Sequence, residues 1–154
     1  MRTVRDDTGR RYLLVKQSGE SSLVRDPETG EEEYVANDRL SAVEGTSPLA
    51  TAATAVPESV RRLLTAVPND RALGLVVELA DTGPTPVVDL LAAYDLCESD
   101  LHGLLSEFRA AGLVREAEVH SARGYDATDL AREAVAHLRP DADLGPDVAT
   151  DDGG

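Results

Sequence analysis

The chain has 154 residues, and its 29 acidic and 15 basic side chains give a formal net charge of −14 at pH 7. That length fits one domain with an appendage or two small domains. The single cysteine, Cys97, excludes an internal disulfide and a zinc cluster built from cysteines. No segment is basic, which is evidence against nucleic-acid binding at ordinary salt, because Lys and Arg contacts to phosphate supply most of the non-specific affinity.

Residues 1–45 are expected to form β-structure. Segment 11–16 is rich in strand-forming residues, and shorter runs follow at 22–25 and 32–35. Turn residues separate these runs, with Gly or Pro in each turn. With the segment before the turn at 6–9, these runs make four short strands, and their spacing predicts an antiparallel meander. A meander this small buries little apolar surface alone, so we expect it to pack on helices or to contact a partner protein.

The composition of residues 46–56 is that of a linker, and a helical pattern follows it. Pro57 fits the first position of a helix that Pro68 ends. Asn69 is a suitable N-cap for the next helix. The residues expected to face the core are Val60, Leu63, Leu64 and Val67 in the first of these helices and Leu73, Val76, Val77 and Ala80 in the second.

Residues 85–138 predict three more helices and a hairpin. We expect helices from 85 to about 94, from 98 to 110 and from 128 to 138, with a hairpin between the last two whose tip is at 120–124. This order of elements is that of a winged helix-turn-helix. The predicted fold class is therefore α+β, with an N-terminal antiparallel β-meander (1–45), a linker (46–56) and a winged helix-turn-helix with its preceding helix (57–138). The acidic tail at 139–154 is expected to be disordered.

Two runs of sequence carry a family resemblance. Residues 101–114 end in Ala-Gly-Leu-Val, and residues 124–133 contain the run Tyr-Asp-Ala-Thr-Asp-Leu-Ala. Together they resemble the ArsR- and MarR-like winged-helix regulators of archaea and bacteria, in which an AGLV-type run ends one helix and a Y-x-L-T-x-x-G run opens the last. Here Ala127 and Ala131 stand where that pattern has Leu and Gly. The resemblance covers about residues 70–138 and none of the meander.

The acidic composition itself is similar to that of proteins from halophilic archaea. Lys16 is the only lysine, and Ala, Val, Asp and Glu are abundant. Molar salt shortens the screening length to about 3 Å, so in that setting a negative net charge does not exclude DNA binding.

The resemblance implies a DNA interface on the third helix of the motif and on the wing. In the family the third helix lies in the major groove, and the wing reaches the minor groove or the backbone. The helix departs from that pattern, because Glu98, Asp100 and Glu107 share its solvent face, where Arg, Lys, Gln or Asn is usual. The wing therefore carries most of the case for DNA. The expected DNA-binding residues are Ser99, His102, Gly103, Ser106, Arg109, Arg115, His120 and Arg123.

Other chemistry is not indicated. His102, His120 and His137 lie on three different elements without a histidine partner at helical spacing, so no metal site is predicted. No phosphate-binding glycine loop or nucleophile context is present, so we expect no enzyme activity, no catalytic residue and no cofactor. The longest apolar runs fall well short of about 18 residues, and no signal peptide is recognised. A cytoplasmic protein without membrane contact is expected.

Two functions stay open at this point. The first is a DNA-binding transcriptional regulator that contacts double-stranded DNA as a homodimer, through an interface formed by the helices at 57–67 and 128–138. The alternative is a winged-helix protein-protein interaction module without direct DNA contact. Pairing of Arg109, Arg115 and Arg123 with carboxylates would weaken the first interpretation.

Overall fold

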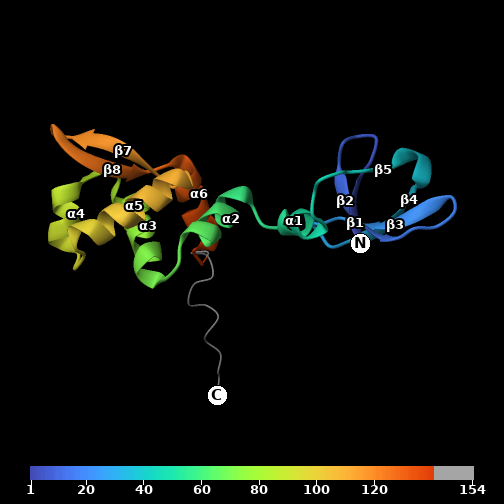
Figure 1. Cartoon of the computed structure of the whole chain (residues 1–154), viewed down its shortest axis with the longest axis horizontal. Helices are drawn as coiled ribbons and strands as arrows, with labels where there is room; N and C mark the ends of the chain where they lie inside the picture. Colours follow the sequence, from blue (N-terminus) through green and yellow to red (C-terminus); the bar gives the residue numbers. More distant parts are fainter. Residues whose placement is uncertain (141–154) are drawn as a thin grey trace, which may run out of the picture. The chain divides into compact units, whose positions relative to one another are not determined.

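The computed structural model describes residues 1–140 and contains two compact units, residues 1–61 and the chain from residue 62 onward (Figure 1). The chain is an α+β protein with an N-terminal antiparallel sheet before the main helices, as the sequence predicted; the sheet has five strands where four were expected. The tail expected to be disordered lies outside the described residues from 141 onward. Within residues 1–140, no helix has the length and apolar character needed to cross a membrane.

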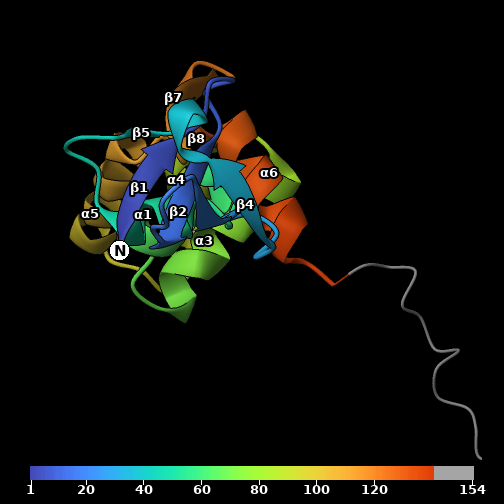
Figure 2. The ribbon, with the colours of Figure 1, turned by 90° about the vertical axis from the view of Figure 1, so that its right-hand side faces the viewer.

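The first unit is built on a sheet with strand order β4-β3-β2-β1-β5 (Figure 2). Its consecutive strands pair as the predicted meander, and a short 3₁₀ helix, η1 (Asn37–Arg39), then leads into β5, which pairs back with β1. One side of the sheet buries an aliphatic and aromatic core of Val4, Tyr12, Val24 and Val35. The strands are β1 (Arg2–Arg5), β2 (Arg11–Lys16), β3 (Ser21–Arg25), β4 (Glu32–Ala36) and β5 (Ser41–Ala42).

A short helix occupies the segment that was expected to be a linker. Helix α1 (Pro48–Ala53) begins after Ser47, whose hydroxyl accepts a hydrogen bond from the Leu49 amide at 3.2 Å. The hydroxyl of buried Thr51 lies 2.6 Å from that of Thr3 on β1. The Ser-Pro start and the small residues that follow suit a helix that packs closely on a sheet. Residues 48–53 are therefore part of the first unit's structure.

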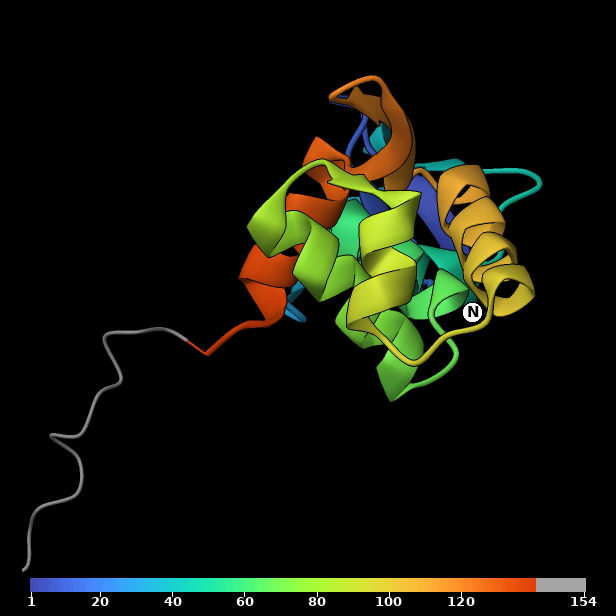
Figure 3. The same ribbon diagram turned by 90° about the vertical axis from the view of Figure 1, so that its left-hand side faces the viewer.

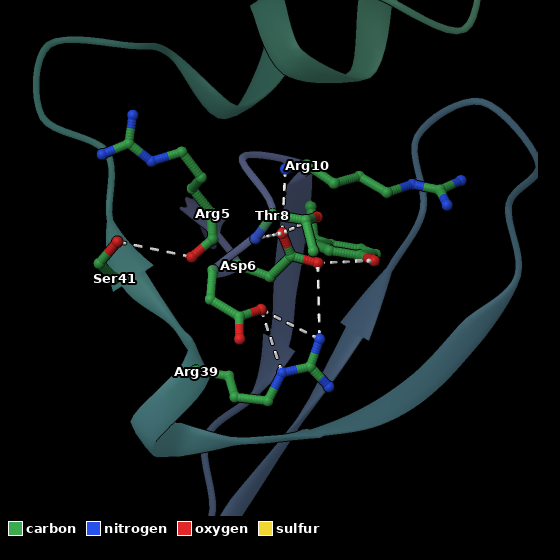
Figure 4. A network of polar contacts seen from close by, with 8 residues as sticks. Arg5, Asp6, Thr8, Arg10, Arg39 and Ser41 are labelled. Atoms are coloured by element: carbon green, nitrogen blue, oxygen red, sulfur yellow. Dashed lines mark hydrogen bonds and ion pairs between the residues drawn. The ribbon is translucent and has the colours of Figure 1, made fainter.

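The turn between β1 and β2 is organised by a buried carboxylate, Asp6 (Figure 4). It accepts hydrogen bonds from the Thr8 hydroxyl at 2.6 Å, the Thr8 amide at 2.9 Å and the Arg10 amide at 3.0 Å. These bonds, with that of the Thr8 hydroxyl the strongest influence, hold the pKa of Asp6 below its ordinary value. Burial raises the pKa of neighbouring Tyr12.

Helix α2 (Glu58–Ala66) leads into the second unit, which combines helices with a three-stranded sheet of order β6-β8-β7. Asn69 caps α3 through the Ala72 amide at 3.0 Å, and Thr128 caps α6 through the Ala131 amide at 3.2 Å, as predicted. Gly112 follows α5 with a positive φ of 79°. The elements are α3 (Asp70–Thr82), β6 (Thr85–Pro86), α4 (Val87–Ala93), α5 (Glu98–Ala110), β7 (Val114–Val119), β8 (Ala122–Ala127) and α6 (Asp129–Leu138).

Some residues expected in the core lie elsewhere. Leu64 is 63% exposed on α2. On α3 the buried residues are Ala72, Leu75, Val76 and Leu79, whereas Leu73, Val77 and Ala80 are only half-buried. Apolar residues cover more than one side of α3, so the helical spacing of apolar residues did not show which side is buried. Thr85 and Pro86, expected to start a helix, instead pair as β6 with Tyr125 and Gly124 of β8.

Candidate functional site

Helix α5 and the β7–β8 hairpin form the candidate site in the second unit (Figure 3). Leu101, Leu105 and Phe108 are fully buried and fix one side of α5 in the core. This leaves the opposite side of the helix to solvent. Of the eight residues predicted as a DNA interface, seven are exposed and His102 is half-buried. The structure thus places the predicted residues on the surface of α5, β7, β8 and the hairpin turn.

The hairpin turn is tighter than expected and conformationally unusual. It consists of His120 and Ser121, which both have positive φ angles, 49° and 67°, and β8 already begins at Ala122. Two consecutive positive φ angles are characteristic of the type I′ hairpin turn, where Asn and Gly are usual. For other residues the left-handed conformation costs about 1–2 kcal/mol each. His120 therefore sits at the exposed tip of the hairpin in a strained turn.

A carboxylate on one side of the hairpin pairs with two of the predicted arginines. Glu116 on β7 accepts from Arg109 of α5 at 3.0 Å and from Arg123 of β8 at 3.4 Å. Arg123 also donates to the Tyr125 hydroxyl at 3.1 Å, and this bond is the main cause of the raised pKa of Arg123. We call Arg109, Glu116 and Arg123 the Glu116 cluster. It contains two guanidinium groups and one carboxylate, so its formal charge is +1.

A second cluster lies on the other side of the hairpin. Strand register places Arg115 opposite Asp126, and side chains alternate between the two sides of a strand. The Asp126 carboxylate, only 4% exposed, accepts from Arg115 at 2.7 Å and from Arg132 of α6 at 2.7 Å. A buried carboxylate needs such partners, because an unpaired one would be strongly destabilising. We call Arg115, Asp126 and Arg132 the Asp126 cluster, which also has a formal charge of +1.

The exposed side of α5 carries little positive charge. Glu98, Asp100 and Glu107 are all exposed on this helix. His102 lies 3.6 Å from Glu98, and Arg109 belongs to the Glu116 cluster. Small residues separate the carboxylates along the helix, namely Ser99, Gly103, Ser106 and Ala110. Such a surface allows close approach of another molecule but offers few bidentate donors to base edges.

One further arginine joins this surface from α3. Arg71 lines a shallow groove of about 320 Å³ together with Ser99 and Gly103, and it donates to the Asp95 carbonyl oxygen at 3.2 Å. From the sequence, Arg71 could extend a basic patch only if its helix packs beside the motif, which the sequence could not show; the packing of α3 against the α4–α5 turn sets its position. Sequence reasoning missed Glu116, Tyr125 and Arg132, which the register of the hairpin and the start of α6 bring to the arginines.

In the described part of the chain, no metal centre accompanies these residues. Within residues 1–140, no group of three or more His, Cys, Asp or Glu side chains is arranged to hold a metal ion. His102, His120 and His137 lie on α5, in the hairpin turn and on α6. The chemistry offered at the site is therefore that of guanidinium groups, hydroxyls and carboxylates.

The chain was compared with protein families, curated proteins and solved structures. Residues 1–139 match a family described as Family of unknown function (DUF7346). No curated protein and no solved structure matches the chain. The family match runs through both units, from the five-stranded sheet to the end of α6. The chain therefore belongs to the Family of unknown function DUF7346.

Proposed function

We propose that the second unit is a winged helix-turn-helix domain that binds double-stranded DNA, and that the protein is a transcriptional regulator of the cytoplasm without catalytic activity. The order α3-β6-α4-α5-β7-β8-α6 and the sheet order β6-β8-β7 support this fold. In such domains the second helix of the motif crosses the DNA backbone and the third enters the major groove. These roles fall to α4 and α5, and the wing is the β7–β8 hairpin.

The observation that carries the DNA proposal is the excess of guanidinium groups at the wing. The two clusters together hold four arginines and two carboxylates. Exposed Glu118 on β7 lies opposite Arg123, so four guanidinium groups face three carboxylates around the hairpin. Arg109, Arg115 and Arg123 are each about 60% exposed. Exposed ion pairs contribute only about 0–1 kcal/mol, so a DNA phosphate can take the place of Glu116 at little cost. A phosphate that replaces Asp126 as the partner of Arg115 costs more, because the buried Asp126 carboxylate would then be left with its Arg132 pair.

Serine hydroxyls and backbone groups of α5 then approach the DNA while the wing arginines contact phosphates. Ser99, Gly103 and Ser106 present no bulk that would hold the helix away from the groove floor. The carboxylates Glu98, Asp100 and Glu107 repel phosphates, and salt in the molar range reduces this repulsion. Base readout from this helix is accordingly weak, and the wing supplies most of the affinity.

A second candidate function is a winged-helix module that binds a basic protein partner. Two observations favour it, namely the exposed carboxylates on α5 and the pairing of the three wing arginines with Glu116 and Asp126. That pairing weakens the DNA proposal. A partner with Lys or Arg on its surface would be complementary to the α5 carboxylates and indifferent to the wing.

The test is binding of the full chain to a fluorescent duplex of random sequence, measured by anisotropy from 0.25 to 2 M KCl. Each lost phosphate contact reduces the slope of log K against log[KCl] by about 0.9. Arg123→Gln is compared with Arg139→Gln. Arg139 follows the C-terminal end of α6, pairs with Asp81 of α3 and is 51% exposed, against 65% for Arg123. Weaker binding by Arg123→Gln alone supports the wing as the interface. Absence of binding, or equal effects of both substitutions, favours the protein-partner function.

A homodimer is also proposed. Leu64 on α2 is 63% exposed and Leu138 on α6 is 50% exposed. Each is an apolar side chain on one of the two helices expected to form the interface. Sedimentation equilibrium of the full chain should show a dimer, and Leu64→Glu should shift it to a monomer. A chain that stays monomeric at all protein concentrations up to about 100 μM would contradict this assembly.

A further inference from the structure

The basic side chains of the first unit differ from those of the wing in how many of them pair with carboxylates. Residues 1–61 contain eight Arg and Lys side chains. Arg10 pairs with Asp26, and Arg39 pairs with Asp7. By contrast, no carboxylate within residues 1–140 forms an ion pair with four exposed or half-exposed bases of the sheet. These four are Arg5, Arg11, Lys16 and Arg25, and we call them the sheet cations.

Regular strand register places three of the sheet cations, Arg5, Arg11 and Arg25, on one side of the sheet. Arg5 on β1 lies opposite Arg11 on β2, and Leu13, two residues further along, lies opposite Arg25 on β3. Partners in register and residues two apart share a side. This side is opposite to the core of Val4, Tyr12, Val24 and Val35.

A β-bulge places the fourth sheet cation, Lys16, on the same side as the other three. The register shifts between Leu14 and Lys16, so that Lys16 lies opposite Leu23 instead of continuing the regular alternation. Leu23 is two residues from Arg25, and Leu23 in turn lies opposite Tyr34 on β4. Without the bulge, the side chain of Lys16 would belong to the core side. Bulges often re-aim a side chain in this way. The only lysine of the chain therefore joins Arg5, Arg11 and Arg25.

The pairing of Arg5 with Arg11 is unfavourable by itself. Like charges directly opposite on neighbouring antiparallel strands have Cβ atoms about 5 Å apart and destabilise the sheet. In Figure 4 the Arg5 guanidinium extends away from the Asp6 carboxylate, and the Ser41 hydroxyl donates to the Arg5 main-chain oxygen at 3.5 Å. A bound phosphate between the two guanidinium groups would remove this repulsion and supply their missing counter-charge.

We propose that the sheet cations form a binding surface for the phosphate backbone of double-stranded DNA. Charge complementarity selects a polyanion. Single-strand binding surfaces use several aromatic side chains to stack successive bases. Within residues 1–61, the one large aromatic side chain that is exposed on this side is Tyr34, at 62%. The surface therefore offers backbone contacts and little stacking. This inference shares its ligand with the proposed function of the second unit but depends on different residues.

The acidic groups near the sheet cations leave them accessible. Glu32 on β4 lies opposite Arg25, yet the two form no ion pair within residues 1–140. The half-buried Arg25 instead contacts the Met1 sulfur at 3.9 Å. Helix α1 covers Thr3 on the same side, between the cations, as the Thr3–Thr51 contact shows. Helix α1 has no charged side chain, so it adds no carboxylate to the side of the sheet that holds the cations.

The test compares the full chain with Arg5→Gln/Arg11→Gln in anisotropy titrations of a random duplex between 0.25 and 2 M KCl. Loss of two phosphate contacts should make the slope of log K against log[KCl] shallower by about 1.8. The affinity of the unmodified chain relative to the variant should therefore grow about 40-fold as KCl falls from 2 to 0.25 M. The matched control is Arg2→Gln/Arg139→Gln, which removes the same charge. Arg2 is on β1 but on the other side from Arg5, and it donates to Gln17. The control should keep a slope close to that of the unmodified chain.

A further variant separates a binding role from a structural one. Arg11→Glu replaces the like-charge pair with an opposite-charge pair to Arg5, so it should raise the melting temperature while weakening duplex binding more than Arg11→Gln. Equal slopes for the sheet variant and its control would overturn the proposal. So would tight binding of vesicles with anionic lipid that depends on Arg5 and Arg11 when the duplex does not bind. Loss of binding in the sheet variant with no effect of Arg123→Gln would support this surface and refute the wing.

Discussion

The buried carboxylate Asp126 offers the sharpest test of how the wing is held. Asp126→Asn removes the charge that receives Arg115 and Arg132 at 2.7 Å each, on a side chain that is 4% exposed. Hydrogen bonds to charged groups contribute about 1.5–3 kcal/mol each. The guanidinium groups are 60% and 36% exposed, so screening reduces this to about 1 kcal/mol each. We expect the free energy of unfolding of the second unit to fall by about 2 kcal/mol.

The matched control is Glu116→Gln, which also removes a carboxylate from two arginines of the wing. Glu116 is 46% exposed, so this change should cost less than about 0.5 kcal/mol. Urea denaturation in 2 M KCl, followed by the helical circular dichroism signal, measures both. Equal losses for the two variants, or a loss below about 0.5 kcal/mol for Asp126→Asn, would refute the role assigned to buried Asp126. Asp126→Asn also releases Arg115 from its ion pair, so this variant should bind a duplex more tightly despite its lower stability.

Three further predictions concern turns and strand pairing. His120→Asn/Ser121→Gly should raise the free energy of unfolding by about 1–2 kcal/mol in urea titrations, because both residues have positive φ; no gain would mean that the turn is not strained. The lowered pKa of Asp6 means that its stabilising effect is present above the unfolded value of 3.8 and is lost as pH falls through the lower folded pKa. Asp6→Asn should therefore weaken the acid dependence of the first unit's melting temperature below about pH 4, and an unchanged profile would contradict this. Gly124→Ala should cost about 1–3 kcal/mol, since the added Cβ would lie 2.4 Å from the Thr85 carbonyl oxygen, and retained stability with intact β6 pairing would refute it.

Elements with local end signals could be predicted from the sequence. Asn69, Thr128 and Gly112 mark helix ends through side-chain caps or a positive φ, and α5 spans the residues expected for it. Such signals act within a few residues, so they can be recognised without knowledge of the tertiary structure. The consecutive strands of the first unit were predicted for the same reason, because turns with Gly separate them.

Elements defined by distant partners could not be predicted. Strands β5 and β6 have two residues each and exist because β1 and β8 pair with them. Helix α1 depends on the contact between Thr51 and Thr3, 48 residues apart. On α2, Leu64 shares the apolar spacing of Leu63, yet it is exposed while Leu63 is buried. Periodicity could not separate them.

The sequence indicated which elements carry the candidate residues but not which charges surround them. The expected residues of α5 and the wing do lie on the surface of one unit. Their carboxylate partners Glu116 and Asp126 were missed, because the register of β7 with β8 and the position of α6 decide which charges meet. The sheet cations were missed for the same reason, since the bulge before Lys16 leaves no mark in the sequence pattern.

The central claim, that the wing contacts DNA, is tested most directly by the arginine side-chain NMR signals of the full chain during titration with a duplex. Our account predicts that the Nε–H signals of Arg115 and Arg123 shift in proportion to bound duplex, whereas that of Arg139, paired with Asp81 at 2.6 Å, stays in place. Saturating duplex that leaves the signals of Arg115 and Arg123 unmoved would contradict it.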